Sequence, residues 1–166
     1  MFEERVLGVD PGLAATGLAV LARKGGPPSV RWADTMKTPA GLPEAARLRR
    51  LHEAIGSAIR EHGVGSVALE SVMWGRNVGS AMSVARATGV VMLAADQAGL
   101  EVEEYAPLEV KMAVAGVGNA TKDQIRSALG RLHRIEAVPA EPNAADAVAV
   151  AFCHLQESRM REVARG

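Results

Sequence analysis

Apolar residues form short continuous runs in some parts of the chain and recur with helical spacing in others. The runs, bounded by Gly and Pro, predict strands at residues 4–11, 14–23, within 29–38, 63–70 and 100–106. The helical spacing predicts helices at residues 43–62, 78–98, 107–114, 122–132 and 142–161. An N-terminal meander followed by alternating helices and strands favours an α/β domain, with a mixed sheet and helices on its faces.

The predicted helix over 78–98 is apolar or small almost all round, and Arg86 is its only charge before Asp96. A helix without a polar face is buried on more than one side. In a chain of 166 residues, another subunit is one candidate for covering the second side.

The length fits a single domain over residues 1–166, which buries roughly 70% of its unfolded surface. We expect a flexible tail from about residue 158. The single cysteine, Cys153, excludes an internal disulfide framework. No signal peptide stands at the N-terminus, and no apolar run approaches the roughly 18 residues of a membrane span. We therefore expect a cytoplasmic protein without a membrane partner.

The formal net charge of the chain is zero, but the charges are segregated. Five bases and only two acids lie between residues 105 and 134. Such a segment can form a local phosphate-binding face, although solvated surface charge is the simpler interpretation.

Asp10 lies in the middle of the apolar run "LGVDPGLAATGLAV", where a charge is costly to bury unless something pairs with it. One interpretation is a turn, because Asp, Pro and Gly are favoured turn residues. The other is a ligand for a cation at the edge of the sheet. The stretch alone favours the turn, so other parts of the chain must decide.

Two further acids stand at comparable places. Glu70 ends the predicted fourth strand, and ligands collect at the carboxyl ends of strands in open α/β sheets. Asp146 is the only charge in the apolar stretch 144–152, and Asn143 shares its helix face. An acid early in a helix also has a structural explanation, since it interacts favourably with the helix dipole.

Four motifs, "LGVDPGLAATGLAV", "VALESVMWGRN", "YAPLEVKMAVAGVGNATKDQI" and "PNAADAVAVAF", occur in an order and spacing that resemble the RuvC family of Holliday-junction resolvases. The resemblance covers residue 6 to about 154. It implies a ribonuclease-H-like fold, with a five-stranded mixed sheet and helices on both faces. It also implies a homodimeric endonuclease that nicks four-way junction DNA symmetrically in recombination and repair, with the RuvAB branch-migration complex as a partner.

By position, Asp10, Glu70 and Asp146 match three of the four acidic active-site residues of the family. Phosphodiester hydrolysis needs an activated water and a stabilised leaving oxygen, which two Mg²⁺ or Mn²⁺ ions about 3.5–4 Å apart supply. Such hard cations prefer oxygen ligands. Asp10 would bridge both ions, and Glu70 and Asp146 would hold one each. The cation-ligand interpretation of Asp10 is therefore preferred over the turn.

The fourth acidic position of the family is Asn143 in this chain. An amide offers a carbonyl oxygen to a cation but brings no charge and cannot act as a base. We expect weaker binding of the second ion, which favours Mn²⁺ over Mg²⁺. Glu136 and Glu141 are less favoured substitutes, and Asn143 as a plain helix cap is the structural alternative.

The loop after Glu70, "SVMWGRN", carries side chains suited to DNA. The resemblance implies an apolar or aromatic probe of stacked bases here; Met73 aligns with it and Trp74 follows. Stacking worth about 1–3 kcal/mol favours Trp74, whereas inward packing of both is the alternative. Arg76 and Asn77 suit phosphate contacts.

Lys111 and Lys122 match positions where the family has lysines near the scissile phosphate. Lys122 stands at a predicted helix start, where backbone amides also attract an anion. Lys111 would stabilise charge in the transition state. Ordinary solvated charge is the alternative for each.

Three other functions remain in competition. A junction-binding protein that does not cut would follow if Asn143 prevents metal binding. An ATPase of the actin and sugar-kinase type is disfavoured, since it needs two such domains. A nuclease for RNA–DNA hybrids is disfavoured by the loop after Glu70 and by the apolar helix 78–98.

Overall fold

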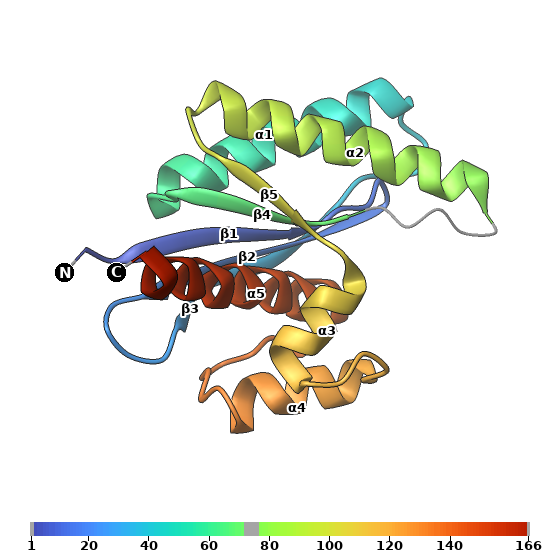
Figure 1. The fold of residues 1–166 in the computed structure, drawn as a ribbon. Coiled ribbons are helices and arrows are strands. Elements are labelled where there is room, and N and C mark those ends of the chain that lie inside the picture. The colour runs from blue at the N-terminus through green and yellow to red at the C-terminus, as the bar shows by residue number, and fades with distance from the viewer. Residues whose placement is uncertain (1, 72–76, 166) are drawn as a thin grey trace.

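The computed structural model describes residues 2–71 and 77–165, and its ribbon is drawn in Figure 1. The strands are β1 (Glu4–Asp10), β2 (Ala15–Arg23), β3 (Ser29–Lys37), β4 (Ser66–Glu70) and β5 (Val102–Tyr105). The helices are α1 (Glu44–His62), α2 (Val78–Gln97), α3 (Pro107–Ala115), α4 (Lys122–Arg131) and α5 (Pro142–Arg165). All the predicted elements are present, mostly within a few residues of their expected ends.

The five strands form one mixed sheet in the order β3-β2-β1-β4-β5. The meander β1-β2-β3 is antiparallel, whereas β4 pairs in parallel with both β1 and β5. This is the predicted α/β architecture, with the parallel strands β1 and β4 adjacent at the centre of the sheet.

Helices cover both faces of the sheet (Figure 1). One core cluster joins α1 and α2 to alternate strand residues such as Leu7 and Val9. The other joins α3, α4 and α5 to the opposite face, through residues such as Val6 and Phe152. Because both faces are buried, the central strands read as continuous apolar runs rather than as alternating patterns.

Helix α2 packs on α1 and buries Ala87, Val91 and Ala95. By length and composition it is apolar enough to cross a membrane, so the expectation that no segment reaches that length is wrong for this helix. Here α2 is a layer of the folded domain, and one such helix is weak evidence for a membrane span. Its outer face remains apolar and exposed.

Helix α5 runs along β1 and β2 and continues to Arg165, past both its predicted end and the start of the expected flexible tail. Arg161 on its last turns pairs with Glu103 of β5. The helix therefore still contacts the sheet beyond residue 158.

His154 on α5 is buried in a polar network. Its Nδ1 lies 2.9 Å from the Tyr105 hydroxyl, and its Nε2 lies 3.2 Å from the Ser66 hydroxyl. Glu103 lies 3.6 Å away. Burial lowers the pKa of His154 despite this carboxylate, so the ring is neutral in the folded protein at neutral pH.

Candidate active site

Strand pairing brings Asp10 and Glu70 to the same edge of the sheet. Val9 of β1 lies opposite Leu69 of the parallel strand β4, and the next residue of each strand is the acid. Each strand ends at its acid, so both carboxylates stand at the carboxyl ends of neighbouring strands, where ligands of α/β sheets collect.

Two glycines allow α5 to approach this edge directly. Gly17 of β2 is the pairing partner of Asp10, and a Cβ atom built on it would overlap the carbonyl group of Asn143. A Cβ on Gly8 would overlap the backbone of Ala147 in the same way. Since neither glycine has a side chain, the first turns of α5 lie on the strand backbones and hold Asp146 beside Asp10.

The three carboxylates and two lysines line one cavity of about 300 Å³. The acids come from β1, β4 and α5, whereas Lys111 comes from α3 and Lys122 from the start of α4. Apolar side chains, among them Val110 and Ile125, complete the walls. The structure thus gathers five predicted site residues from five separate elements.

Burial and mutual repulsion make it costly to ionise Asp10 and Glu70 in the absence of a cation. Desolvation, followed by the charges of Glu70 and Asp146, raises the pKa of Asp10 to about 7. Desolvation and the charge of Asp146 also raise the pKa of Glu70, and the two lysines oppose this increase. A bound cation would compensate such a concentration of negative potential.

Lys122 already supplies part of that compensation. Its Nζ lies 2.8 Å from Oδ2 of Asp146, and this hydrogen bond raises the pKa of the lysine. The Lys122 side chain is 74% exposed, so it can turn from Asp146 towards a phosphate at the mouth of the cavity. Lys111, on α3, is half-buried and lines the same cavity.

Asn143 does not line the cavity, although it stands one turn before Asp146. Its Nδ2 donates to Oε1 of Glu141 at 3.1 Å. Glu141 also accepts from the backbone N of Ala144 at 2.8 Å and from the hydroxyl of Thr35. The cap of α5 is therefore Glu141, and the alternative that Asn143 is the helix cap is wrong.

The predicted DNA-contacting residues Met73, Trp74 and Arg76 lie outside the described residues. Asn77 is exposed and caps α2, with its Oδ1 accepting from the backbone N of Ser80 at 3.2 Å. This bond uses the carbonyl oxygen and leaves the role of its amide group in phosphate contact a prediction.

The family described as crossover junction endodeoxyribonuclease RuvC matches residues 6–154 of the chain. The chain belongs to the RuvC family. The RuvC of Thermotoga petrophila is 36% identical over 162 residues, which cover 98% of each chain. The RuvC of Desulfitobacterium hafniense strain DCB-2 is 42% identical over 149 residues and 90% of each chain.

Solved RuvC structures have the same fold. T. thermophilus RuvC in complex with Holliday junction substrate matches with a TM-score of 0.88 and 32% identity, over 95% of this chain and 96% of that one. The yeast mitochondrial Holliday junction resolvase Ydc2 matches with a TM-score of 0.68 at 10% identity, over 90% of this chain and 77% of that one, which shows the fold alone. The ribonuclease-H-like fold predicted for the RuvC family is confirmed.

RuvC nucleases depend on metal ions, and the donor set of this cavity fits that requirement. Every candidate ligand is a carboxylate oxygen, the kind that Mg²⁺ and Mn²⁺ prefer. Among the described residues, no three His, Cys, Asp or Glu side chains form a ready-made metal cage. A partial ligand set is typical of sites that bind an ion through one or two carboxylates, waters and substrate phosphates.

The roles of Gly8 and Gly17 in seating α5, and that of Glu141 as its N-terminal cap, were not predicted. The two glycines carry a signal, because glycine inside a buried strand marks a close approach of another backbone. Glu141 directly precedes Pro142, where an acid at a helix start was a readable capping signal.

Proposed function

We propose that this protein is a structure-specific endonuclease that resolves four-way DNA junctions in recombination and repair. The observation that carries the proposal is the cavity itself, because Asp10, Glu70 and Asp146 meet there beside two lysines. Membership of the RuvC family agrees with this chemistry. A junction-binding protein that does not cut is disfavoured, because these three acids are all present and share one site.

The three acids would hold two Mg²⁺ or Mn²⁺ ions, with Asp10 shared between them. Bound ions activate the attacking water and stabilise the leaving oxygen of the phosphodiester. The seat of α5 on Gly17 fixes the position of Asp146 relative to Asp10. The sheet and α5 therefore act as a rigid frame for the ligands.

The two lysines would bind the scissile phosphate from two sides. Lys122, which pairs with Asp146 in this structure, would pair with a phosphate oxygen instead, helped by the backbone amides at the start of α4. Lys111 stabilises the additional negative charge of the transition state from the wall formed by α3.

A homodimer would supply the two equivalent sites that symmetric nicking requires. Val78, Met82, Met92 and Leu93 are exposed and large, and helical spacing places them on one face of α2. Self-association through this face would bury them. The RuvAB complex as a partner and a cytoplasmic location complete the proposal, on the strength of the family resemblance.

Nicking of a mobile four-way junction with Mg²⁺ or Mn²⁺ tests the proposal. The wild type should produce paired symmetric nicks, and Asp10→Asn should bind the junction without nicking it. Asn143→Asp should increase activity with Mg²⁺ more than with Mn²⁺, because it restores the missing charge. Tight junction binding without nicks under either metal would refute the nuclease assignment.

A further inference from the structure

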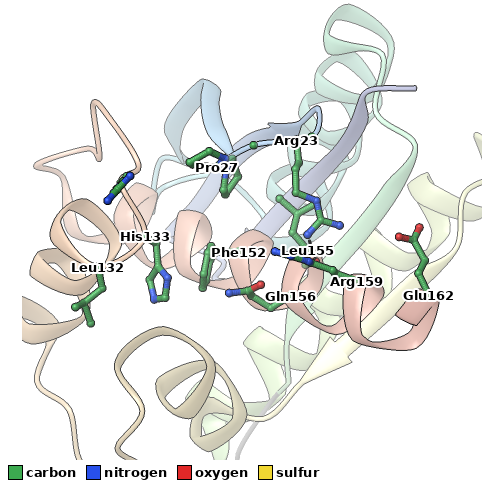
Figure 2. Close-up of a pocket in the computed structure, with 13 residues that line it drawn as sticks. Arg23, Pro27, Leu132, His133, Phe152, Leu155, Gln156, Arg159 and Glu162 are labelled. Carbon is green, nitrogen blue, oxygen red and sulfur yellow. Dashed lines mark hydrogen bonds between the residues drawn. The ribbon is translucent and has the colours of Figure 1, made fainter. Parts of the chain in front are cut away.

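A second cavity, of about 580 Å³, lies between three segments that are distant in sequence. Its walls are the turn between β2 and β3, the segment that follows α4, and the C-terminal half of α5. Figure 2 shows side chains from these segments around the cavity, with Pro27 on one side, Leu132 and His133 on another, and Arg159 and Glu162 along α5.

This cavity lies at the opposite end of the sheet from the carboxylates. In the β1–β2 register, Arg23 at its wall pairs with Glu4, whereas Gly17 pairs with Asp10, six residues along the strand. Six residues of strand span about 20 Å. Arg159 stands thirteen residues after Asp146 on α5, which also corresponds to about 20 Å. A molecule bound here leaves the active site free.

The charge of the cavity is mainly positive. Of its lining residues, Arg23, Arg134 and Arg159 are cationic and Glu162 is the one acid. Arg23 is held in place, because it donates to the carbonyl of Leu155 at 2.6 Å and to Glu4 at 2.8 Å. Among the described residues, Arg134 and Arg159 have no hydrogen-bond or ion-pair partner. Two exposed guanidinium groups are therefore available to an anion.

The cavity also has an apolar component that a phosphate contact alone would not use. Leu132 is 67% exposed at the rim, and Leu155 and Phe152 form part of the floor. The His133 ring packs on Phe152 with a centroid distance of 4.2 Å. On its other side, Leu132 borders a second hollow of about 500 Å³, which exposed Val117 also lines.

We propose that this cavity is a docking site for an acidic segment of another protein, with a large apolar side chain inserted beside Leu132 and carboxylates on Arg134 and Arg159. Exposed arginines around apolar anchors are typical of protein interfaces. Duplex DNA is the less favoured occupant, since the apolar floor offers nothing to a phosphate backbone. In the proposed function, the DNA substrate binds at the other end of the sheet, beside Asp10 and Glu70.

The test uses a fluorescein-labelled peptide of sequence Gly-Asp-Glu-Leu-Asp-Asp-Phe-Glu-Gly and measures its fluorescence polarisation on the full chain without DNA. The double variant Arg134→Glu/Arg159→Glu should bind it at least about tenfold more weakly, because each substitution replaces attraction by repulsion. Arg49→Glu/Arg50→Glu, an equal change of charge on α1, should alter binding less than about twofold. Replacing Leu and Phe of the peptide by Ala should also weaken binding.

Four-way junction affinity and nicking should be the same in Arg134→Glu/Arg159→Glu as in the wild type, which separates this proposal from the nuclease assignment. Chemical-shift changes on adding peptide to the wild type should concentrate at Leu132 and Leu155. The proposal is overturned if the two double variants bind the peptide equally. It is also overturned if a peptide with Lys at every acidic position binds as tightly, or if junction affinity falls as much as peptide affinity, which would make the cavity a DNA contact.

Discussion

Gly17→Ala should reduce the rate of DNA nicking by much more than an equal loss of stability elsewhere in the core would. The added Cβ would overlap the carbonyl group of Asn143 and lie 3.2 Å from the backbone N of Ala144. Restoring an ordinary C···O separation of about 3.3 Å requires the start of α5 to move by more than about 1 Å. Asp146 lies on the next turn and must move with it.

A displacement of about 1 Å in a catalytic constellation can cost about a hundredfold in rate. Overpacking of a close contact typically costs about 1–3 kcal/mol in the free energy of unfolding. The assay is single-turnover nicking of preformed junction complexes, in which differences in junction affinity cancel. The Mn²⁺ concentration for half-maximal binding, measured by calorimetry without DNA, should rise as well, because the ligands no longer converge.

Two control variants separate position from stability. Gly130→Ala adds a Cβ in α4 where no atom lies within 4 Å, so it should leave the rate unchanged and stabilise by about 0.5–1 kcal/mol. Ile55→Val should lose about 0.5–1.5 kcal/mol from the core on the other face of the sheet, with little loss of rate. The reasoning is refuted if Gly17→Ala nicks at the wild-type rate, or if its nicking rate falls no further than that of Ile55→Val.

Further predictions concern charge, pH and assembly. Asp10→Asn should raise the melting temperature of the metal-free protein while abolishing nicking, because it removes a buried charge that two neighbouring acids repel. A lower melting temperature would contradict this. Because the pKa of His154 is lowered in the folded state, the unfolded chain takes up a proton first as the pH falls below about 6.5. The free energy of unfolding of the wild type relative to that of His154→Gln, measured by urea titration, should therefore decrease from pH 7 towards pH 5, since both proteins share the opposing contribution of Asp10, whose pKa is raised. Met82→Glu/Leu93→Glu should shift the protein to monomers in sedimentation velocity; unchanged association would exclude the α2 face as the interface.

The order of elements could be predicted because each has a simple local cause. Buried strands are apolar on both faces, and α4 begins with the capping box of Thr121 and Gln124. The ends of α5 were less predictable. Its C-terminal turns are polar, and the sequence pattern therefore predicts an earlier end. In the structure these turns are helical, and Arg161 forms an ion pair with Glu103 of β5.

The candidate site was predicted as a set of residues but not as a geometry. Strand ends identified Asp10 and Glu70, the isolated charge in an apolar helical stretch identified Asp146, and the family resemblance joined the three into one site. The ion pair between Lys122 and Asp146 joins residues 24 positions apart, so no local pattern indicates it. The second cavity was beyond prediction for the same reason, since its arginines come from three separate segments.

The seat of α5 on the sheet also restricts how this protein can evolve. Gly8 meets Ala147 and Ala151 of the helix, so both surfaces already carry nearly the smallest residues available. A larger residue on the strand cannot be offset by a smaller one on the helix, and a larger residue on the helix cannot be offset by a smaller one on the strand. Mutations here cannot compensate one another in pairs, as they do in ordinary cores. Neutral drift should therefore concentrate on the outward side of α5, while its inner side stays fixed by geometry even where no residue touches the DNA.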